Sequence, residues 1–158
     1  MLSLDTSTAI DIMKMRSGRD TRARFAAALD AGERICVSSV VVHELMVGSL
    51  KSARPSEHMQ RVDNLLTRLD IVDFSADDAI SAARLRAELE GAGRSIGALD
   101  TLIAGQALAR DWTIVTKDLK HFLRVEGLPI IDWTRSDQPL DRPDVLAQML
   151  ASRLKEDK

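Results

Sequence analysis

Short apolar segments alternate with longer amphipathic segments along almost the whole chain, and this alternation limits the fold more than any other feature. The apolar segments are rich in Ile, Val and Leu, as expected of short buried strands. They lie at 2–4, 35–37, 71–73, 113–115 and 129–131. Strands separated by helices pair in parallel through right-handed crossovers. The sequence therefore predicts an α/β fold with a central, mostly parallel twisted sheet of four or five strands flanked by helices.

The segments between these strands carry helix start and stop signals. Ser75 and Asp78 have the spacing of a capping box, and Gly32 and Gly91 stand where helices should end. The segment 40–50 has apolar residues at helical spacing, although its β-branched start also suits a strand. The predicted helices are one that follows Asp5 and the hydroxyl residues 6–8, then 20–31, 40–50, one that begins at Pro55, 75–91 and 99–107.

Size and charge limit the class of protein. A chain of 158 residues with 45% apolar and 29% charged residues fits one globular domain. The net charge of −2 excludes a globally basic surface for nucleic acid, so any contact with a polyanion must be local. Aromatic residues make up only 3% of the chain, which argues against base-stacking platforms.

The chain carries no signal for export or membrane insertion. Asp5 and Asp11 interrupt the apolar start, and no apolar run approaches the roughly 18 residues that a membrane helix needs. The single cysteine, Cys36, lies between Ile35 and Val37 and is expected to be a buried, reduced thiol. These features predict a cytoplasmic protein.

Four acidic residues, Asp5, Glu44, Asp100 and Asp118, lie near the ends of the predicted strands or in the crossovers between them. Asp5 follows the first strand, and Asp118 lies just beyond the strand 113–115. Glu44 is in the helix after the second strand, and Asp100 opens a helix that leads into 113–115. In open parallel sheets, functional side chains gather beyond the carboxyl ends of the strands. The four carboxylates are therefore expected to converge.

Converging carboxylates suggest a metal site. They repel one another, so such a cluster either takes up protons or binds hard cations such as Mg2+ or Mn2+. Two such ions about 4 Å apart suit phosphodiester hydrolysis, because they activate water and neutralise the developing charge. Each acid also has a structural interpretation: Asp5 and Asp118 suit helix N-caps, and Asp100 suits the positive end of its helix. Glu44 is harder to explain in this way, because its neighbours form a wide apolar face.

Several short motifs surround these acids. They read LSLDTS, SSVVVHELMVGSLKS, SIGALDTLIAGQALARDWTIVTKD, LKHF and GLPIIDW, and together they span residues 2–133. Their order and spacing resemble the PIN-domain ribonucleases, most of all the VapC toxins of bacterial toxin–antitoxin pairs. The resemblance implies that Asp5, Glu44, Asp100 and Asp118 are the catalytic, metal-binding acids. It also implies that the hydroxyl of Thr116 positions one of the carboxylates.

The chain departs from the usual family pattern at two positions. Ser7 stands where asparagine is common, and His121 stands where an acid is common. His121 lies one helical turn from Asp118. We favour a solvated histidine on a helix, with an outer-shell or substrate contact as the alternative.

The resemblance implies an endoribonuclease that depends on Mg2+ or Mn2+ and leaves a 5′-phosphate and a 3′-hydroxyl. Structured RNA such as transfer RNA is the implied substrate class. A cognate antitoxin would hold the enzyme inactive, often by placing an arginine at the acidic site. The implied assembly is a homodimer that contacts DNA only through the antitoxin complex and does not bind membranes.

Basic residues near the acids are candidates for contacts with the phosphates of RNA. We single out Arg86, since related proteins often carry an arginine in the helix before Asp100, and Lys117, which neighbours Asp118. Ordinary charges on a helix surface are the competing explanation for both.

The segment after Trp133 extends beyond the motifs, so we divide the chain into a PIN-like nuclease domain over 1–133 and an extension over 134–158. A helix is predicted from Asp141. Its apolar stripe consists of Val145, Leu146, Met149, Leu150 and Leu154. Packing on its own domain is one interpretation of this stripe, and docking on a second subunit or on the antitoxin is the other.

Rival functions fit the acids less well. A phosphoryl-transfer receiver domain and a haloacid-dehalogenase-type phosphatase each require another acid close to Asp5, where this chain has Thr6 and Ser7. A non-enzymatic partner-binding module predicts the loss of a site acid, and all four are present. A non-toxin PIN-fold nuclease that processes RNA stays open as an alternative, because its site would be the same.

Overall fold

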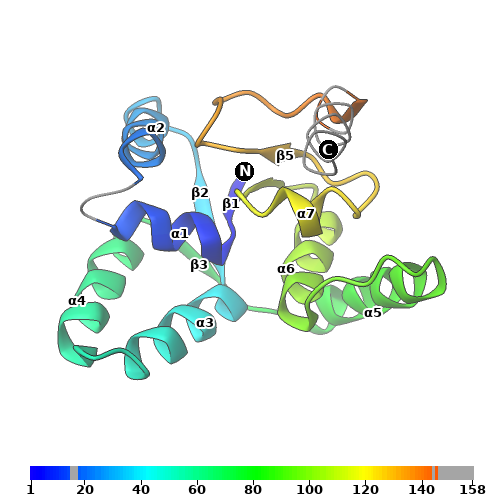
Figure 1. The fold of residues 1–158 in the computed structure, drawn as a ribbon, viewed down its shortest axis with the longest axis horizontal. Coiled ribbons are helices and arrows are strands. Elements are labelled where there is room, and N and C mark those ends of the chain that lie inside the picture. The colour runs from blue at the N-terminus through cyan, green and yellow to red at the C-terminus, as the bar shows by residue number, and fades with distance from the viewer. Residues whose placement is uncertain (15–17, 144, 146–158) are drawn as a thin grey trace, which may run out of the picture.

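The computed structural model describes residues 1–14, 18–143 and 145, and the chain folds around one five-stranded sheet. All strand pairs are parallel, in the order β3-β2-β1-β4-β5. The strands are β1 (Leu2–Leu4), β2 (Ile35–Ser38), β3 (Asp70–Val72), β4 (Thr113–Val115) and β5 (Ile130–Ile131). Helices lie on both sides of the sheet (Figure 1). The predicted parallel α/β sheet is confirmed, with the third strand shifted by one residue.

The helices also follow the sequence prediction, with ends shifted by one or two residues. They are α1 (Thr6–Met13), α2 (Arg19–Asp30), α3 (Ser39–Leu50), α4 (Pro55–Leu66), α5 (Ala76–Gly91), α6 (Ala98–Ala109) and α7 (Leu119–Phe122). The β-branched start of α3 is helical because Ser38 caps it, its hydroxyl accepting from Val40 N at 3.1 Å. The capping box of Ser75 and Asp78 is present at the start of α5. The four-residue helix α7 begins after Asp118, as the N-cap interpretation of Asp118 implied, although it is too short to show an apolar period.

The core is built from aliphatic side chains of the inner strands and the covering helices. Leu4, Val37 and Ile114 are fully buried, and Phe25 packs against Trp133 with ring centroids 6.1 Å apart. Cys36 is also fully buried, and burial raises the pKa of its thiol to about 11. The prediction of a buried Cys36 is therefore confirmed.

Helix α6, which carries Asp100, is held tightly against α5. A Cβ atom added at Gly105 would lie only 2.4 Å from the Cα of Ala82, so the two backbones touch at a point where a side chain does not fit. At the far end of α6, the Arg110 guanidinium donates to Asp78 at 2.9 and 2.7 Å and holds the pKa of that carboxyl well below its usual range. These contacts fix the position of α6 and so of its first turn.

The described part of the extension packs on the domain. Arg142 donates to the backbone carbonyls of Leu123, Val125 and Leu128, and Val145 is buried in the core. The rest of the predicted apolar stripe, from Leu146 onward, lies outside the described residues. Within the described ranges, no helix is long and apolar enough to cross a membrane.

Candidate metal centre

The site begins where the two central strands end side by side. Strands β1 and β4 pair in parallel with Leu4 opposite Val115, and the Asp5 backbone N–H donates to the Val115 carbonyl at 3.0 Å. The next residue of each strand, Asp5 and Thr116, therefore lies at the same edge of the sheet. Asp5 and Thr116 are both buried, at 3% and 0% exposure.

A hydroxyl network orients the Asp5 carboxylate. Its Oδ2 accepts from the Thr116 hydroxyl at 2.9 Å, from the Ser7 hydroxyl at 2.6 Å and from the Ser7 backbone N–H at 3.2 Å. The same Thr116 oxygen accepts from the Asp118 backbone N–H at 2.9 Å. Asp5 is thus the N-cap of α1, as its structural interpretation required. Since all of these bonds use Oδ2, the capping role does not use the second carboxylate oxygen, Oδ1.

Glu44 reaches the same place from α3. Its Oε2 accepts from the Thr6 hydroxyl, in the first turn of α1, at 2.6 Å. Burial raises the pKa of Glu44, and the negative charges of Asp5 and Asp100 raise it further. The hydrogen bond from Thr6 opposes this shift. Glu44 thus lies close enough to Asp5 and Asp100 for their charges to act on its carboxylate.

Asp100 lies in the first turn of α6, facing α7. The N-cap of α6 is Gly97. A Cβ atom added at Gly97 would lie 2.7 Å from Asp100 Oδ2, so a side chain at this position would crowd the carboxylate. Burial raises the pKa of Asp100, and the charges of Asp5 and Asp118 raise it further against the opposing effect of His121. Burial and the neighbouring negative charges therefore both disfavour the ionised form of this carboxyl.

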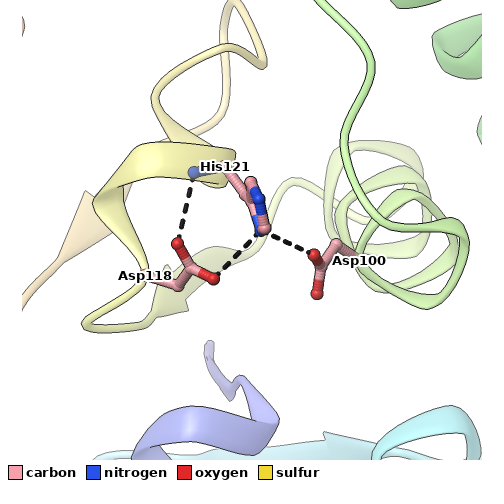
Figure 2. A group of neighbouring side chains, drawn as sticks. All are labelled: Asp100, Asp118 and His121. Carbon is pink, nitrogen blue, oxygen red and sulfur yellow. Dashed lines mark hydrogen bonds and ion pairs between the residues drawn. The ribbon is translucent and has the colours of Figure 1, made fainter.

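Asp118 and His121 complete the cluster from α7. Asp118 is the N-cap of this helix and accepts from the His121 backbone N–H at 3.3 Å. Figure 2 shows the His121 imidazole between the two carboxylates, with Nδ1 3.0 Å from Asp100 Oδ2 and 3.0 Å from Asp118 Oδ2. Ligand atoms of these three residues all lie within 4.8 Å of one another.

The placement of His121 contradicts the sequence interpretation of a solvated helix histidine. Its Nδ1 is shielded from solvent, and neither carboxylate contact has the geometry of a hydrogen bond, so this nitrogen has no hydrogen-bond partner among the described residues. The α7 helix turns the ring inward toward Asp100, a residue 21 positions earlier on another helix. Spacing along the chain relates His121 to Asp118 but says nothing about Asp100.

The donor set fits a divalent cation. Carboxylate oxygens are the preferred ligands of Mg2+ and Mn2+, and a cation relieves the repulsion that raises the pKa of Glu44 and Asp100. The buried Nδ1 without a hydrogen bond is a further atom that a cation would satisfy.

Lys117 and Arg86 are the two residues predicted to contact phosphate, and within the described ranges neither forms a hydrogen bond or ion pair with the four acids or with His121. The Lys117 ammonium is 2.5 Å from Asp11 Oδ1, and the same oxygen also pairs with Lys14 at 3.3 Å. Arg86 is exposed on α5 and pairs with Glu90 at 2.7 Å. Both stay predictions. The sequence did not assign Thr6 or His121 to the site and marked Ser7 only as a departure from the family pattern. The signal for Thr6 and Ser7 was their position directly after Asp5.

Known proteins similar to this chain share its fold and most of its length. The PIN domain family matches residues 2–128, which include all four acids. The tRNA(fMet)-specific endonuclease VapC of Salmonella typhimurium is 35% identical over 130 residues, covering 82% of this chain and 96% of that protein. The protein of the same name from Shigella flexneri is 37% identical over 131 residues, covering 83% and 96%. In the crystal structure of VapBC2 from Rickettsia felis bound to a DNA fragment from their promoter, a chain 32% identical superposes with a TM-score of 0.78, covering 84% of this chain and 98% of that one.

Proposed function

We propose, because this chain belongs to the PIN-domain family of VapC ribonuclease toxins, that Asp5, Glu44, Asp100 and Asp118 form its catalytic metal centre. The observation that carries the proposal is the convergence of these acids from four separate elements, with the pKa of Glu44 and of Asp100 raised by burial and then by the neighbouring negative charges. Mg2+ or Mn2+ is the proposed cofactor, since both ions favour oxygen ligands.

Hydroxyl groups of the chain position the carboxylates of two of these acids. Thr116 and Ser7 orient Asp5, and Thr6 orients Glu44, each through a hydroxyl that donates to a carboxylate. A divalent cation bound by the acids would supply the Lewis acidity that activates water and neutralises charge on the phosphodiester. Because Thr116 also accepts from the Asp118 backbone, its hydroxyl couples the positions of two ligands.

Transfer RNA is the substrate class that we propose, and tRNA(fMet) is the candidate within that class. Two relatives that match this chain over 96% of their own length are named as tRNA(fMet)-specific endonucleases. Arg86 and Lys117 are the proposed phosphate contacts. Lys117 suits this role by its place beside Asp118, although its ammonium is shared with Asp11 in the free protein.

A small antitoxin is the proposed partner. The similar Rickettsia felis chain was crystallised as VapBC2 with promoter DNA. By this likeness we propose that a VapB-type protein binds the chain and that DNA is contacted through the complex. From the family resemblance we further propose that the chain forms a homodimer and that the antitoxin covers the acidic site. RNA cleavage and its control would then both take place in the cytoplasm. A neighbouring gene for such an antitoxin separates this function from that of a PIN-fold nuclease that processes RNA.

The chain is proposed to act as one nuclease domain over 1–133 with an extension over 134–158. The bonds from Arg142 to three backbone carbonyls and the burial of Val145 support an extension that packs on its own domain. For the apolar residues after Val145, docking on a second subunit or on the antitoxin stays the alternative.

The test is cleavage of total RNA by the purified protein with Mg2+, with Mn2+ and with a chelator. The matched variants are Asp100→Asn, which removes a proposed ligand, and Asp63→Asn, which makes the same change at an exposed position of α4. We expect cleavage that needs metal, persists in Asp63→Asn and is lost in Asp100→Asn, with sequencing of the new ends showing the target. Cleavage by Asp100→Asn at the parent rate would exclude the proposed site, and cleavage outside transfer RNA would exclude the proposed substrate.

A further inference from the structure

His121 differs from the four acids in that it offers a nitrogen to the proposed centre. Its Nδ1 lies 3.0 Å from one oxygen of Asp100 and 3.0 Å from one oxygen of Asp118. An ordinary surface histidine would have both ring nitrogens open to water. Here the side chain is 33% exposed overall, yet Nδ1 itself is buried, so the solvent-exposed part of the side chain lies elsewhere.

The two contacts of Nδ1 are not hydrogen bonds. A single N–H can point at one oxygen, but this nitrogen is equally distant from two and satisfies the angular requirement for neither. A buried nitrogen in this position costs free energy unless another group uses it. A cation lying among the three ligand atoms would use the lone pair of Nδ1 and one oxygen of each carboxylate.

The spacing agrees with such a role. In octahedral coordination with bonds of about 2.1 Å, neighbouring ligand atoms are about 3.0 Å apart. The two nitrogen-to-oxygen distances have this value. The backbone of His121 is also tied to Asp118, because its N–H donates to the other oxygen of that carboxylate at the start of α7. Asp118 therefore accepts from the His121 backbone with Oδ1 and faces the His121 ring with Oδ2, the oxygen that it would offer to an ion (Figure 2).

We propose that His121 is a direct ligand of the catalytic cation, through Nδ1, and that this nitrogen makes the centre prefer Mn2+ to Mg2+. The inference rests on the metal centre of the proposed function and adds a ligand to it. Imidazole binds first-row transition metals well, whereas Mg2+ prefers oxygen ligands and keeps several of its waters. A centre made of the four carboxylates alone would not have this preference to the same degree.

The decisive measurement is pulsed electron paramagnetic resonance of Mn2+ bound to the purified full chain. A directly bound imidazole gives a nitrogen coupling, and the chain has three histidines that can be tested separately. We expect the coupling in the parent protein and its loss in His121→Asp, which substitutes an oxygen ligand, and in His121→Gln, which adds no charge. The matched controls His43→Gln and His58→Gln, on α3 and α4, should keep the coupling.

Calorimetric titration supplies the second readout. The ratio of the Mg2+ dissociation constant to the Mn2+ dissociation constant should fall about tenfold in His121→Asp and stay unchanged in the two control variants. Circular dichroism of each variant confirms that it is folded.

The outcomes separate this inference from the proposed function. Bound Mn2+ without nitrogen coupling in the parent, or coupling that persists in both His121 variants, overturns the His121 ligand while metal-dependent RNA cleavage still supports the nuclease. Failure of the parent to bind Mn2+ overturns the inference, and if cleavage with Mg2+ is also absent, the proposed function fails with it.

Discussion

Replacing Thr116 by valine tests whether one buried hydroxyl organises the site. Valine has nearly the same shape, but it removes the bond to Asp5 Oδ2 and the bond from the Asp118 backbone, both 2.9 Å long. Because Thr116 is fully buried, water cannot replace either partner. A bond to a charged group contributes about 1.5–3 kcal/mol and a neutral one about 1 kcal/mol, so the free energy of unfolding should fall by roughly 2–4 kcal/mol.

Thermal unfolding in the presence of a chelator measures this loss without interference from bound metal. For a chain of this size, about 1 kcal/mol corresponds to roughly 2–4 °C in Tm, so the expected fall is on the order of 5–15 °C. Thr116→Ser is the matched control, since it keeps the hydroxyl and loses only a methyl group, at about 1 kcal/mol. RNA cleavage should be nearly abolished in the valine variant and largely kept in the serine variant.

Two results would refute the reasoning. Equal Tm values for Thr116→Val and the parent would show that the hydroxyl does not stabilise the buried carboxylate. Equal loss of cleavage in Thr116→Val and Thr116→Ser would show that the methyl group, rather than the hydrogen bonds, is what the site requires.

Three further changes test other parts of the structure. Gly105→Ala should lower the free energy of unfolding by about 1–3 kcal/mol, because its Cβ would lie 2.4 Å from the Cα of Ala82; a urea titration that shows no change contradicts this packing. Asp78→Asn should cost about 2–3 kcal/mol at pH 7, where Arg110 holds the Asp78 pKa below its ordinary 3.8. The folded state binds fewer protons at Asp78 than the unfolded state, so the difference between parent and variant should shrink as the pH falls below 3.8, and a difference independent of pH down to 2 would be inconsistent with it. Asp100→Asn should be at least as stable as the parent in chelator, since it relieves repulsion, but should lose the gain of about 2.7 kcal/mol that the parent obtains from metal at 100 times Kd. Equal metal-induced Tm shifts in the two proteins would disagree with Asp100 as a ligand.

Much of the fold was predictable because its signals are local. Buried strands such as β4 can be recognised in the sequence as short β-branched runs. The capping box of Ser75 and Asp78 involves backbone groups only three residues apart. The rule that functional side chains gather beyond the carboxyl ends of parallel strands was enough to predict that Asp5 and Asp118 lie near each other. The family resemblance added Thr116, and the structure shows its hydroxyl on Asp5.

The roles of His121 and Lys117 depended on contacts that the sequence does not contain. His121 contacts Asp100 because the first turn of α6 faces α7. Helix α6 is in turn held against α5 by the close approach of Gly105 to Ala82 and by the bond of Arg110 to Asp78. Lys117 follows a site strand, yet its ammonium pairs with Asp11 on α1, on the other side of a crossover.

By itself the sequence determined the order and type of the elements and pointed to the candidate acids, because hydrophobic period, capping and strand-end position are properties of neighbouring residues. Only the tertiary structure decided which oxygen of Asp5 accepts the hydrogen bonds of Thr116 and Ser7, and which nitrogen of His121 faces Asp100 and Asp118 without a hydrogen bond. Those outcomes depend on pairs such as Thr116 and Asp5, separated by 111 positions, whose geometry is set by strand register and helix packing.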